Sequence, residues 1–189
     1  MKKFVILISG NGSNLQAIIN DIYHNKLKAE IVTVISNKKK AQGLIRAKDN
    51  NISTIYLPYI SKKMDRNDYD KNLQETISHY HPDLIICAGW MHVLSYEFIN
   101  FFNQKGIKII NLHPALPNMI PGKNSIEDAL VLFKKNKIKH TGIMVHHVIP
   151  EIDAGNVIRT QIVKIYNCDS INDLKSRIQY FEKQTLISA

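Results

Sequence analysis

The feature that most constrains the fold of this chain is a series of short apolar runs that alternate with segments of helical periodicity. Phe4 to Ile8 is a continuous apolar run, the pattern of a strand buried on both faces of a parallel sheet. The pattern then continues with strands over 31–35, 53–57 and 83–88 and helices over about 41–50 and 67–80. This alternation predicts parallel crossover units. We therefore expect an α/β fold with a doubly wound, mostly parallel sheet, Rossmann-like in its N-terminal half.

The C-terminal part of the chain predicts a different arrangement. A strand ending at His113 and a helix over about 124–135 are followed by strand patterns at His140–Ile149 and Asn156–Ile165. Because the connection between these last two strands is short, we expect them to be antiparallel. A final helix then places apolar residues along one face, from Ile171 to Phe181.

Length and charge limit the function classes. With 189 residues, 44% of them apolar, the chain is expected to form a single domain over 1–189. The formal charge of +9 first suggests nucleic acid. However, the densest basic runs, Lys38–Lys40, Lys62–Lys63 and Lys134–Lys135, are short and lack interleaved aromatic residues. We therefore expect no nucleic-acid partner and interpret the charge as a field that attracts small anionic substrates.

Cysteine usage and the N-terminus predict a cytoplasmic location. Cys87 and Cys168 form no metal or redox spacing, which is typical of a reducing compartment. The first apolar run has only five residues, too few for a signal peptide, and no run has transmembrane length, so no membrane partner is expected. His146 and His147 are adjacent and should face opposite sides of a strand, which argues against a histidine metal cluster.

A glycine-rich turn follows the first strand. Ser9-Gly10-Asn11-Gly12-Ser13-Asn14 leads into a helix with apolar residues at helical spacing, an arrangement that directs N–H groups and a positive helix end at an anion, typically phosphate. A third glycine and a Gly-Lys-Ser/Thr motif are both missing, so neither the dinucleotide nor the Walker pattern applies. A turn without a ligand is the alternative.

Two further segments indicate chemistry. Asn111 and His113 should project to one side at the end of their strand, before a loop rich in proline that ends at Gly122. An amide can donate to a developing oxyanion, and an imidazole can act as acid or base; the alternative is a turn-capping Asn and a satisfied His. The mostly apolar loop Gly89–Ser95 either fills the core or lines a pocket for a flat ligand.

Taken together, these motifs resemble those of one enzyme family. The motifs are Ile8-Ser-Gly-Asn-Gly-Ser-Asn-Leu-Gln-Ala-Ile18, Ala88-Gly-Trp-Met-His-Val-Leu94, Asn111-Leu-His-Pro-Ala-Leu116, and His146 with Ile152-Asp153-x-Gly155. In this order and spacing, over nearly the whole chain, the sequence resembles the glycinamide ribonucleotide formyltransferases, also called phosphoribosylglycinamide formyltransferases, of the folate-dependent formyltransferase family.

The resemblance implies a reaction. Members of the family transfer the formyl group of 10-formyltetrahydrofolate to the amine of 5'-phosphoribosylglycinamide in de novo purine (IMP) biosynthesis. The products are formylglycinamide ribonucleotide and tetrahydrofolate. It implies 10-formyltetrahydrofolate as co-substrate, no metal, and small molecules as partners. Both a monomer and a homodimer are consistent with it.

The resemblance also implies residue roles. It implies catalytic roles for Asn111, His113 and Asp153. It implies binding of substrate phosphate and ribose by Gly12, Ser13, Asn14, Gln179 and Glu182, and binding of folate by Arg66, Met91, His92, Val93, Leu94 and Asn111. From spacing alone, Gln179 and Glu182 would be an ordinary solvated pair on a helix face.

Three departures and three alternatives accompany the resemblance. The family often has Arg at the position of His92 and Phe or Tyr at that of Trp90, so folate affinity or pterin fit should differ. It often has Ser at the position of Met144, so a thioether replaces a hydroxyl near the site. A methionyl-tRNA formyltransferase would need room for an RNA-binding domain, and a formyltetrahydrofolate hydrolase would need a regulatory domain before Phe4. A non-catalytic folate- or nucleotide-binding module is the third alternative, and a turnover assay separates it from an enzyme.

Overall fold

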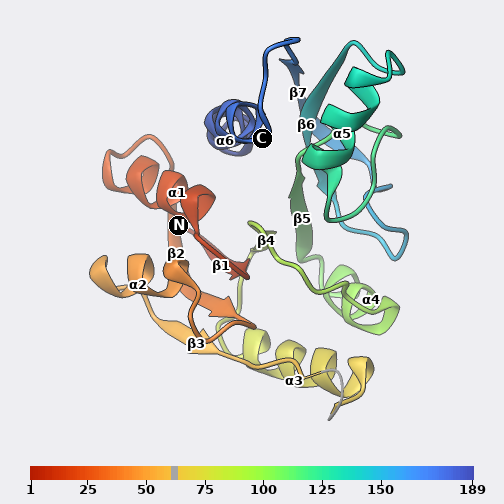
Figure 1. Cartoon of the computed structure of the whole chain (residues 1–189). Coiled ribbons are helices and arrows are strands. Elements are labelled where there is room, and N and C mark those ends of the chain that lie inside the picture. The colour runs from red at the N-terminus through yellow and green to blue at the C-terminus, as the bar shows by residue number, and fades with distance from the viewer. Residues whose placement is uncertain (61–63) are drawn as a thin grey trace. The chain divides into compact units, whose positions relative to one another are not determined.

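The computed structural model describes residues 1–60 and 64–189, which form two compact units, Met1–Asn111 and Leu112–Ala189 (Figure 1). The basic pair Lys62–Lys63 lies outside the described residues. The strands are β1 (Lys2–Ile8), β2 (Ala29–Ser36), β3 (Thr54–Tyr56), β4 (Leu84–Cys87), β5 (Lys108–His113), β6 (His140–His147) and β7 (Val157–Lys164). The helices are α1 (Ser13–Tyr23), α2 (Gln42–Asp49), α3 (Arg66–Ser78), α4 (Tyr96–Gln104), α5 (Ser125–Lys134) and α6 (Ile171–Ile187).

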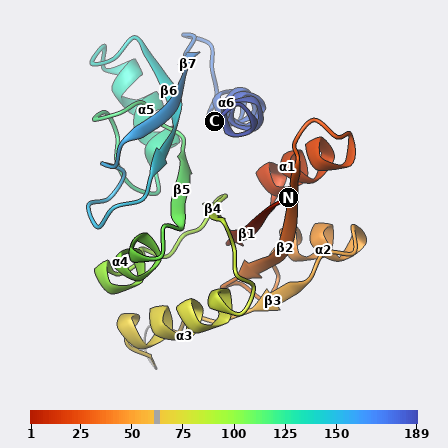
Figure 2. The same cartoon turned by 180° about the vertical axis from the view of Figure 1, so that it is seen from behind.

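The first unit is a doubly wound parallel sheet. Its strands lie in the order β3-β2-β1-β4-β5, and each neighbouring pair is parallel. The chain moves outward from β1 to β3 and then returns to β4, so the order reverses between β1 and β4. Helix α1 contacts α2, and α3 contacts α4 (Figure 2). Right-handed crossovers place these two pairs on opposite faces of the sheet, as the apolar runs predicted.

The core of this unit follows from its apolar pattern. Residues Val5 to Ile8 of β1 are fully buried, as expected for a central strand covered on both faces. In α1, Leu15 and Ile18 are buried whereas Asn20 is exposed, so the helix has one apolar face. Burial of each such aliphatic side chain contributes about 1.5–3 kcal/mol to folding.

The second unit contains an antiparallel strand pair. Strands β6 and β7 pair with Thr141 opposite Val163, which confirms the predicted antiparallel connection. The structure ends β6 at His147, two residues before the predicted end at Ile149. Helix α6 packs on β6 and β7, and α5 packs on α6.

A partly buried ion pair ties α6 to the segment before it. The Asp169 carboxylate accepts two hydrogen bonds from the Arg177 guanidinium, at 2.6 and 2.8 Å, and one from the backbone N–H of Tyr166 at 2.8 Å. The guanidinium also lies over the Tyr166 ring, 4.6 Å from its centroid. The charge-assisted bonds from Arg177 hold the pKa of Asp169 below its usual range. Arg177 therefore ties the helix to the segment that precedes it.

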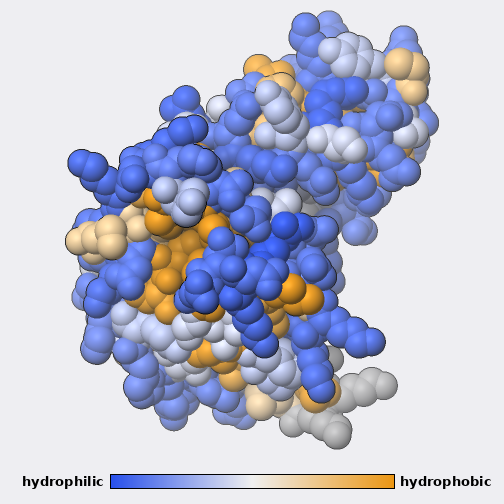
Figure 3. Space-filling view, turned by 90° about the vertical axis from the view of Figure 1, so that its left-hand side faces the viewer, coloured by the Kyte–Doolittle hydropathy of each residue, from blue (hydrophilic) through white to orange (hydrophobic). Residues whose placement is uncertain are grey.

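Hydrophilic residues predominate on the face of the molecule drawn in Figure 3, with apolar residues gathered in patches between them. Among the described residues, no helix has both the length and the hydropathy needed to cross a bilayer.

Candidate active site

The glycine-rich turn adopts a conformation that requires glycine. Gly12, which precedes α1, is buried and has φ 74°, in the left-handed region that glycine tolerates best. A Cβ on Gly12 would lie 2.6 Å from the Cα of Gly43 in α2. Within the described residues no side chain caps α1. The turn therefore ends at the positive end of α1, where the first backbone N–H groups of the helix have no side-chain cap from the described part of the chain, as the strand-turn-helix pattern predicted.

The turn lies beside the loop Gly89–Ser95. The backbone N–H of Ser9 donates to the Gly89 carbonyl at 2.9 Å, and the N–H of Met91 donates to Ser9 Oγ at 2.9 Å. These contacts arise because β1 and β4 are parallel neighbours whose carboxyl ends meet at the switch point of the sheet. Ligands of doubly wound sheets bind at this edge.

The loop Gly89–Ser95 both fills the core and presents apolar side chains. Trp90 and Leu94 are only 9% and 5% exposed, whereas Met91 and Val93 are 57% and 44% exposed. The sequence left core packing and pocket lining as alternatives, and the structure divides the loop between them.

The side chain of His92 points into the protein. It is 4% exposed, and its Nε2 lies 2.6 Å from Oδ1 of Asp70 on α3. The other oxygen of Asp70 accepts the backbone N–H of Ser95, the residue that caps α4. The Tyr59 and Tyr69 rings pack edge-on against the imidazole, with centroids 4.7 and 4.9 Å away. His92 therefore anchors the loop to α3 through Asp70.

Arg66 lies at the same loop. It is the first residue of α3, and its guanidinium donates to the carbonyl of Leu94 at 2.6 Å. The first unit thus contains all six residues predicted to bind folate, and Arg66 contacts the loop that carries four of them, Met91, His92, Val93 and Leu94. Asn111, the sixth, pairs with Cys87 where β5 meets β4.

In the second unit, Asp153 lies between two imidazoles. Its Oδ2 is 3.4 Å from His113 Nδ1, and its Oδ1 is 3.5 Å from His146 Nε2. All three side chains are largely buried, with exposures of 11%, 6% and 3% respectively. The backbone N–H of Gly122 also donates to Asp153 Oδ2 at 3.0 Å.

Backbone carbonyls assign a proton on each of these rings. His113 Nε2 lies 2.7 Å from the Ile120 carbonyl, and His146 Nδ1 lies 2.9 Å from the His147 carbonyl. A carbonyl can only accept, so these ring nitrogens carry hydrogen. Each ring therefore directs its other nitrogen at Asp153, where a further proton would make a charge-assisted contact.

Asp153 is held as a carboxylate. Burial alone would raise its pKa, but the hydrogen bond from His146, the N–H of Gly122 and the charge of His113 together lower the pKa of Asp153 below its ordinary value. Its backbone has φ 54°, a costly conformation for a residue other than glycine. A Cβ at Gly155 would overlap the His147 carbonyl, so glycine is required there.

The remaining predicted residues lie on α6. Gln179 is exposed and Glu182 is half-buried, and the two are separated by about one helical turn. Two residues with clear roles in these clusters were not assigned by sequence reasoning. Asp70 could have been suspected because an acid stands at a buried position between Tyr69 and Leu73 of α3. The second is His146, which the motifs grouped with Asp153 but to which no role was assigned; the structure places its Nε2 3.5 Å from Asp153 Oδ1.

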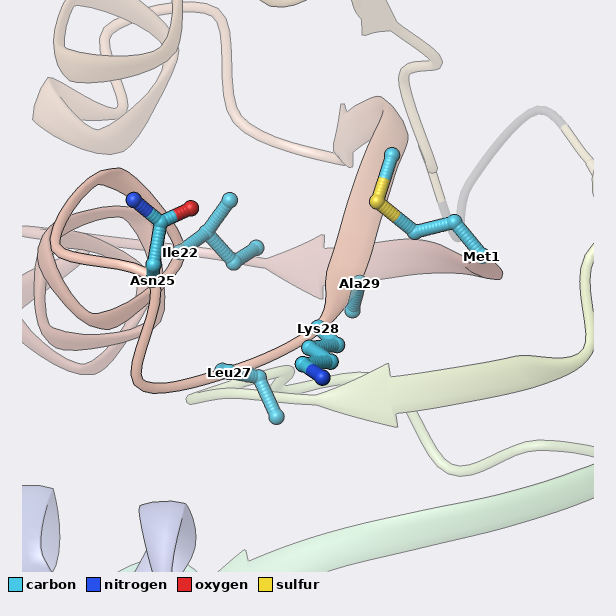
Figure 4. A pocket seen from close by; sticks show the side chains of 6 residues that line it. All are labelled: Met1, Ile22, Asn25, Leu27, Lys28 and Ala29. Atoms are coloured by element: carbon cyan, nitrogen blue, oxygen red, sulfur yellow. The ribbon is translucent and has the colours of Figure 1, made fainter.

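The hollow drawn in Figure 4 is not part of this site. It has a volume of about 440 Å³ and lies where β1 and β2 begin, at their amino ends, whereas the glycine-rich turn follows the carboxyl end of β1. Its lining residues are Met1, Ile22, Asn25, Leu27, Lys28 and Ala29. Among the residues that the structure describes, no group of three or more His, Cys, Asp or Glu side chains could hold a metal ion.

Comparison with known proteins identifies the family. The sequence profile described as "Formyl transferase" matches residues 2–189. The chain belongs to the formyl transferase family. This membership confirms the resemblance inferred from the four motifs and the α/β fold expected with it.

Relatives within the formyl transferase family are similar over nearly the whole of this chain and most of their own length. The phosphoribosylglycinamide formyltransferase of Dictyostelium discoideum is 45% identical over 97% of this chain and 94% of its own. The enzyme of the same name from Escherichia coli is 39% identical over 93% of this chain and 79% of its own. The solved phosphoribosylglycinamide formyltransferase of Coxiella burnetii is 37% identical, with a TM-score of 0.87 over 99% of this chain and 84% of that one.

Proposed function

We propose that this formyl transferase moves the formyl group of 10-formyltetrahydrofolate to the primary amine of 5'-phosphoribosylglycinamide, a step of purine biosynthesis. The observation that carries the proposal is the contact between the Asp153 carboxylate and His113, whose atoms Oδ2 and Nδ1 are 3.4 Å apart. His113 in turn lies two residues after Asn111 on β5. Relatives that carry the name phosphoribosylglycinamide formyltransferase, at 45% and 44% identity over nearly the whole chain, support it. One family profile covers residues 2–189, which supports a single formyltransferase domain. The two cysteines are free thiols, which supports the reducing environment of the cytoplasm.

The reaction defines what the residues must do. The neutral amine forms a bond to the formyl carbon, the carbonyl oxygen gains negative charge, and the bond from carbon to the folate nitrogen then breaks. The amine proton finally moves to the departing nitrogen. The side-chain N–H of Asn111 and the Nε2–H of His113 are the donors for the developing oxyanion. Because Nε2–H of His113 donates to Ile120 in this structure, that bond must be exchanged for the substrate oxygen.

Asp153 acts through charge. A carboxylate whose pKa is held low is a weak base but a good partner for an imidazolium. It therefore orients His113 as a donor, while the amine proton reaches the folate nitrogen through water. His146 contacts Asp153 Oδ1, whereas Gly122 donates to Oδ2, and His146 is therefore a positioning residue.

The binding roles divide between the units. In the first unit, Gly12, Ser13 and Asn14 bind the substrate phosphate through the start of α1. Met91, Val93 and Leu94 form the pterin contact together with Asn111, and Arg66 meets the acidic folate tail. His92, with its imidazole on Asp70, belongs to the folate subsite as the residue that supports this loop. In the second unit, Gln179 and Glu182 contact the ribose.

The residues fit the co-substrate in chemical type. A pterin is flat and needs both apolar contact and hydrogen bonding, and this loop offers the exposed side chains of Met91 and Val93 beside backbone held in place by Ser9. The guanidinium of Arg66, already at the Leu94 carbonyl, supplies the charge that a glutamate tail requires.

The test is folate release from 10-formyltetrahydrofolate, followed by absorbance with and without the ribonucleotide, for the wild type and Asp153→Asn. We expect release that requires the ribonucleotide and falls at least about a hundredfold in the variant, the scale of losing transition-state charge stabilisation. Release without the ribonucleotide would instead identify a hydrolase. Ligand binding without release would identify a binding module.

A further inference from the structure

The glycine-rich turn is held by one side chain from α2 that the roles above do not use. Arg46 donates from Nε to the Asn11 carbonyl at 2.9 Å and from one terminal nitrogen to Asn11 Oδ1 at 3.0 Å. Its other terminal nitrogen donates to Gln16 Oε1 at 3.4 Å. The guanidinium thus joins the residue before Gly12 to the first turn of α1.

The register of α2 places Arg46 at this position. Gly43 and Arg46 are three residues apart and share one face of the helix. The backbone of Gly43 approaches Gly12 closely, and its N–H donates to the Gly10 carbonyl at 3.1 Å. This contact sets the distance between α2 and the turn. The guanidinium of Arg46 is therefore within hydrogen-bond distance of Asn11.

The bond to the Asn11 carbonyl has a directional consequence. In a planar trans peptide, the carbonyl of one residue and the N–H of the next point in opposite directions. By holding the Asn11 carbonyl toward α2, Arg46 turns the Gly12 N–H away from α2. This N–H is among the groups to which the proposed function assigns the substrate phosphate.

The charge of Arg46 is available to an anion. Within the described part of the chain, the guanidinium forms no ion pair with a carboxylate, since its partners are a carbonyl and two amide oxygens. Because these partners are uncharged, they do not neutralise the positive charge of Arg46. Its electrostatic potential at the turn therefore adds to that of the positive end of α1.

We infer that Arg46 is a positioning residue for the phosphate of the acceptor, which orients the N–H groups of the turn and so selects a phosphorylated acceptor over its dephosphorylated form. This inference rests on the proposed function for the identity of the acceptor. It assigns Arg46 no contact with the reacting atoms.

The test compares Arg46→Gln and Arg46→Lys with Lys48→Gln, an exposed charge on the same helix that serves as the control. We expect Arg46→Gln to raise KM for phosphoribosylglycinamide about tenfold or more, the scale of one charge-assisted hydrogen bond. KM for 10-formyltetrahydrofolate and turnover of the acceptor without phosphate should stay within about twofold of wild type. Lys48→Gln should resemble wild type.

Arg46→Lys separates positioning from charge. Lysine keeps the charge but cannot reproduce the planar fork, so we expect most of the KM increase to remain. Full recovery of KM with lysine would overturn the positioning role. Equal increases in both KM values, or an unchanged KM in Arg46→Gln, would overturn it as well.

A binding measurement separates this inference from the proposed function. Ribose 5-phosphate is titrated into the wild-type protein and Arg46→Gln while the backbone amide signals of Gly12 to Asn14 are followed by NMR. We expect saturable shifts in the wild type and about tenfold weaker binding in the variant. That result supports the inference even if no formyl transfer is measured. Equal affinity in the two proteins overturns it even if transfer is confirmed.

Discussion

Single residues in this protein do their work through the side chains that surround them. Asp153 shows this most clearly, because two imidazoles and the Gly122 N–H converge on one carboxylate. Desolvation alone would favour its neutral form, but these neighbours reverse the balance. These neighbours therefore preserve, at a largely buried position, the negative charge that supports His113.

Asn111→Ala should lower kcat roughly 100- to 1000-fold, the usual effect of removing one oxyanion donor. The thermal unfolding midpoint should stay close to wild type because Asn111 is only partly buried at the end of its strand. Steady-state kinetics with both substrates provide the measurement. Asn103→Ala, at an exposed position of α4, is the matched control, and near-normal kcat in Asn111→Ala would reject the donor role.

Asp153 should also contribute pH-dependent stability. Its folded pKa is lowered, so the contribution is present above the unfolded value of about 3.9 and is lost as the pH falls through the folded pKa. The unfolding midpoint of the wild type minus that of Asp153→Asn should shrink as the pH falls below about 4. Asp68→Asn, exposed on α3, should show no such change, and a difference that grows below about pH 4 would contradict the sign.

Secondary-structure elements act here by holding loops. Helix α3 supplies Arg66 to the carbonyl of Leu94 and Asp70 to His92 and Ser95, so one helix fixes the loop Gly89–Ser95 at several points. Helix α2 does the same for the glycine-rich turn. Loops that carry proposed binding residues are thus attached to rigid elements, which limits the entropy lost when a ligand binds.

Asp70→Asn should destabilise the protein by roughly 3 kcal/mol, because an amide cannot accept from both His92 and Ser95 and a buried pair is broken. Chemical denaturation with urea measures this loss. KM for 10-formyltetrahydrofolate should rise more than KM for the ribonucleotide, since the loop loses its anchor. Glu75→Gln, an exposed position on the same helix, should leave both quantities unchanged, and equal stability of Asp70→Asn and wild type would refute the anchoring role.

Gly12→Ala should disturb the turn itself. The new Cβ would lie 2.6 Å from the Gly43 Cα, and φ is 74°, so both contact and conformation oppose it. We expect KM for the ribonucleotide to rise at least about tenfold. Gly10→Ala is the control because a Cβ there meets nothing within 4 Å. The same KM in both variants would show that the close approach of Gly12 and Gly43 is unimportant for binding.

The whole molecule adds an electrostatic field. The formal charge of +9 is spread over the chain instead of being gathered into one run. A field of this kind speeds the encounter with anionic substrates and is screened by salt, with a Debye length of about 10 Å at 0.1 M. The folate tail and the ribonucleotide phosphate are both anionic.

Accordingly, kcat/KM for the ribonucleotide should fall several-fold between 0.02 and 0.5 M salt while kcat stays nearly constant, because screening weakens encounter and binding but not the chemical step. The measurement is a salt series at constant pH. The acceptor without phosphate supplies the control, since it lacks the charge on which the field acts. A kcat that falls in parallel with kcat/KM would point to a salt effect on folding or chemistry instead.

Local patterns in the sequence determined most of the fold. Among the described residues, the apolar runs located the strands and the periodic segments located the helices other than α4, and Gly12, Pro114 and Gly155 marked the turns around which the motifs are built. The family followed from the order of these motifs. Such signals are readable because periodicity and turn chemistry depend on residues a few positions apart.

Only the tertiary structure decided the partners of individual side chains. It turned His92 inward to Asp70, placed Asp153 between His113 and His146, and brought Arg46 to Asn11. Each of these contacts joins residues separated by seven to forty positions. The sequence has no local signal for them, because they arise when strands and helices pack and bury polar groups that must then find partners.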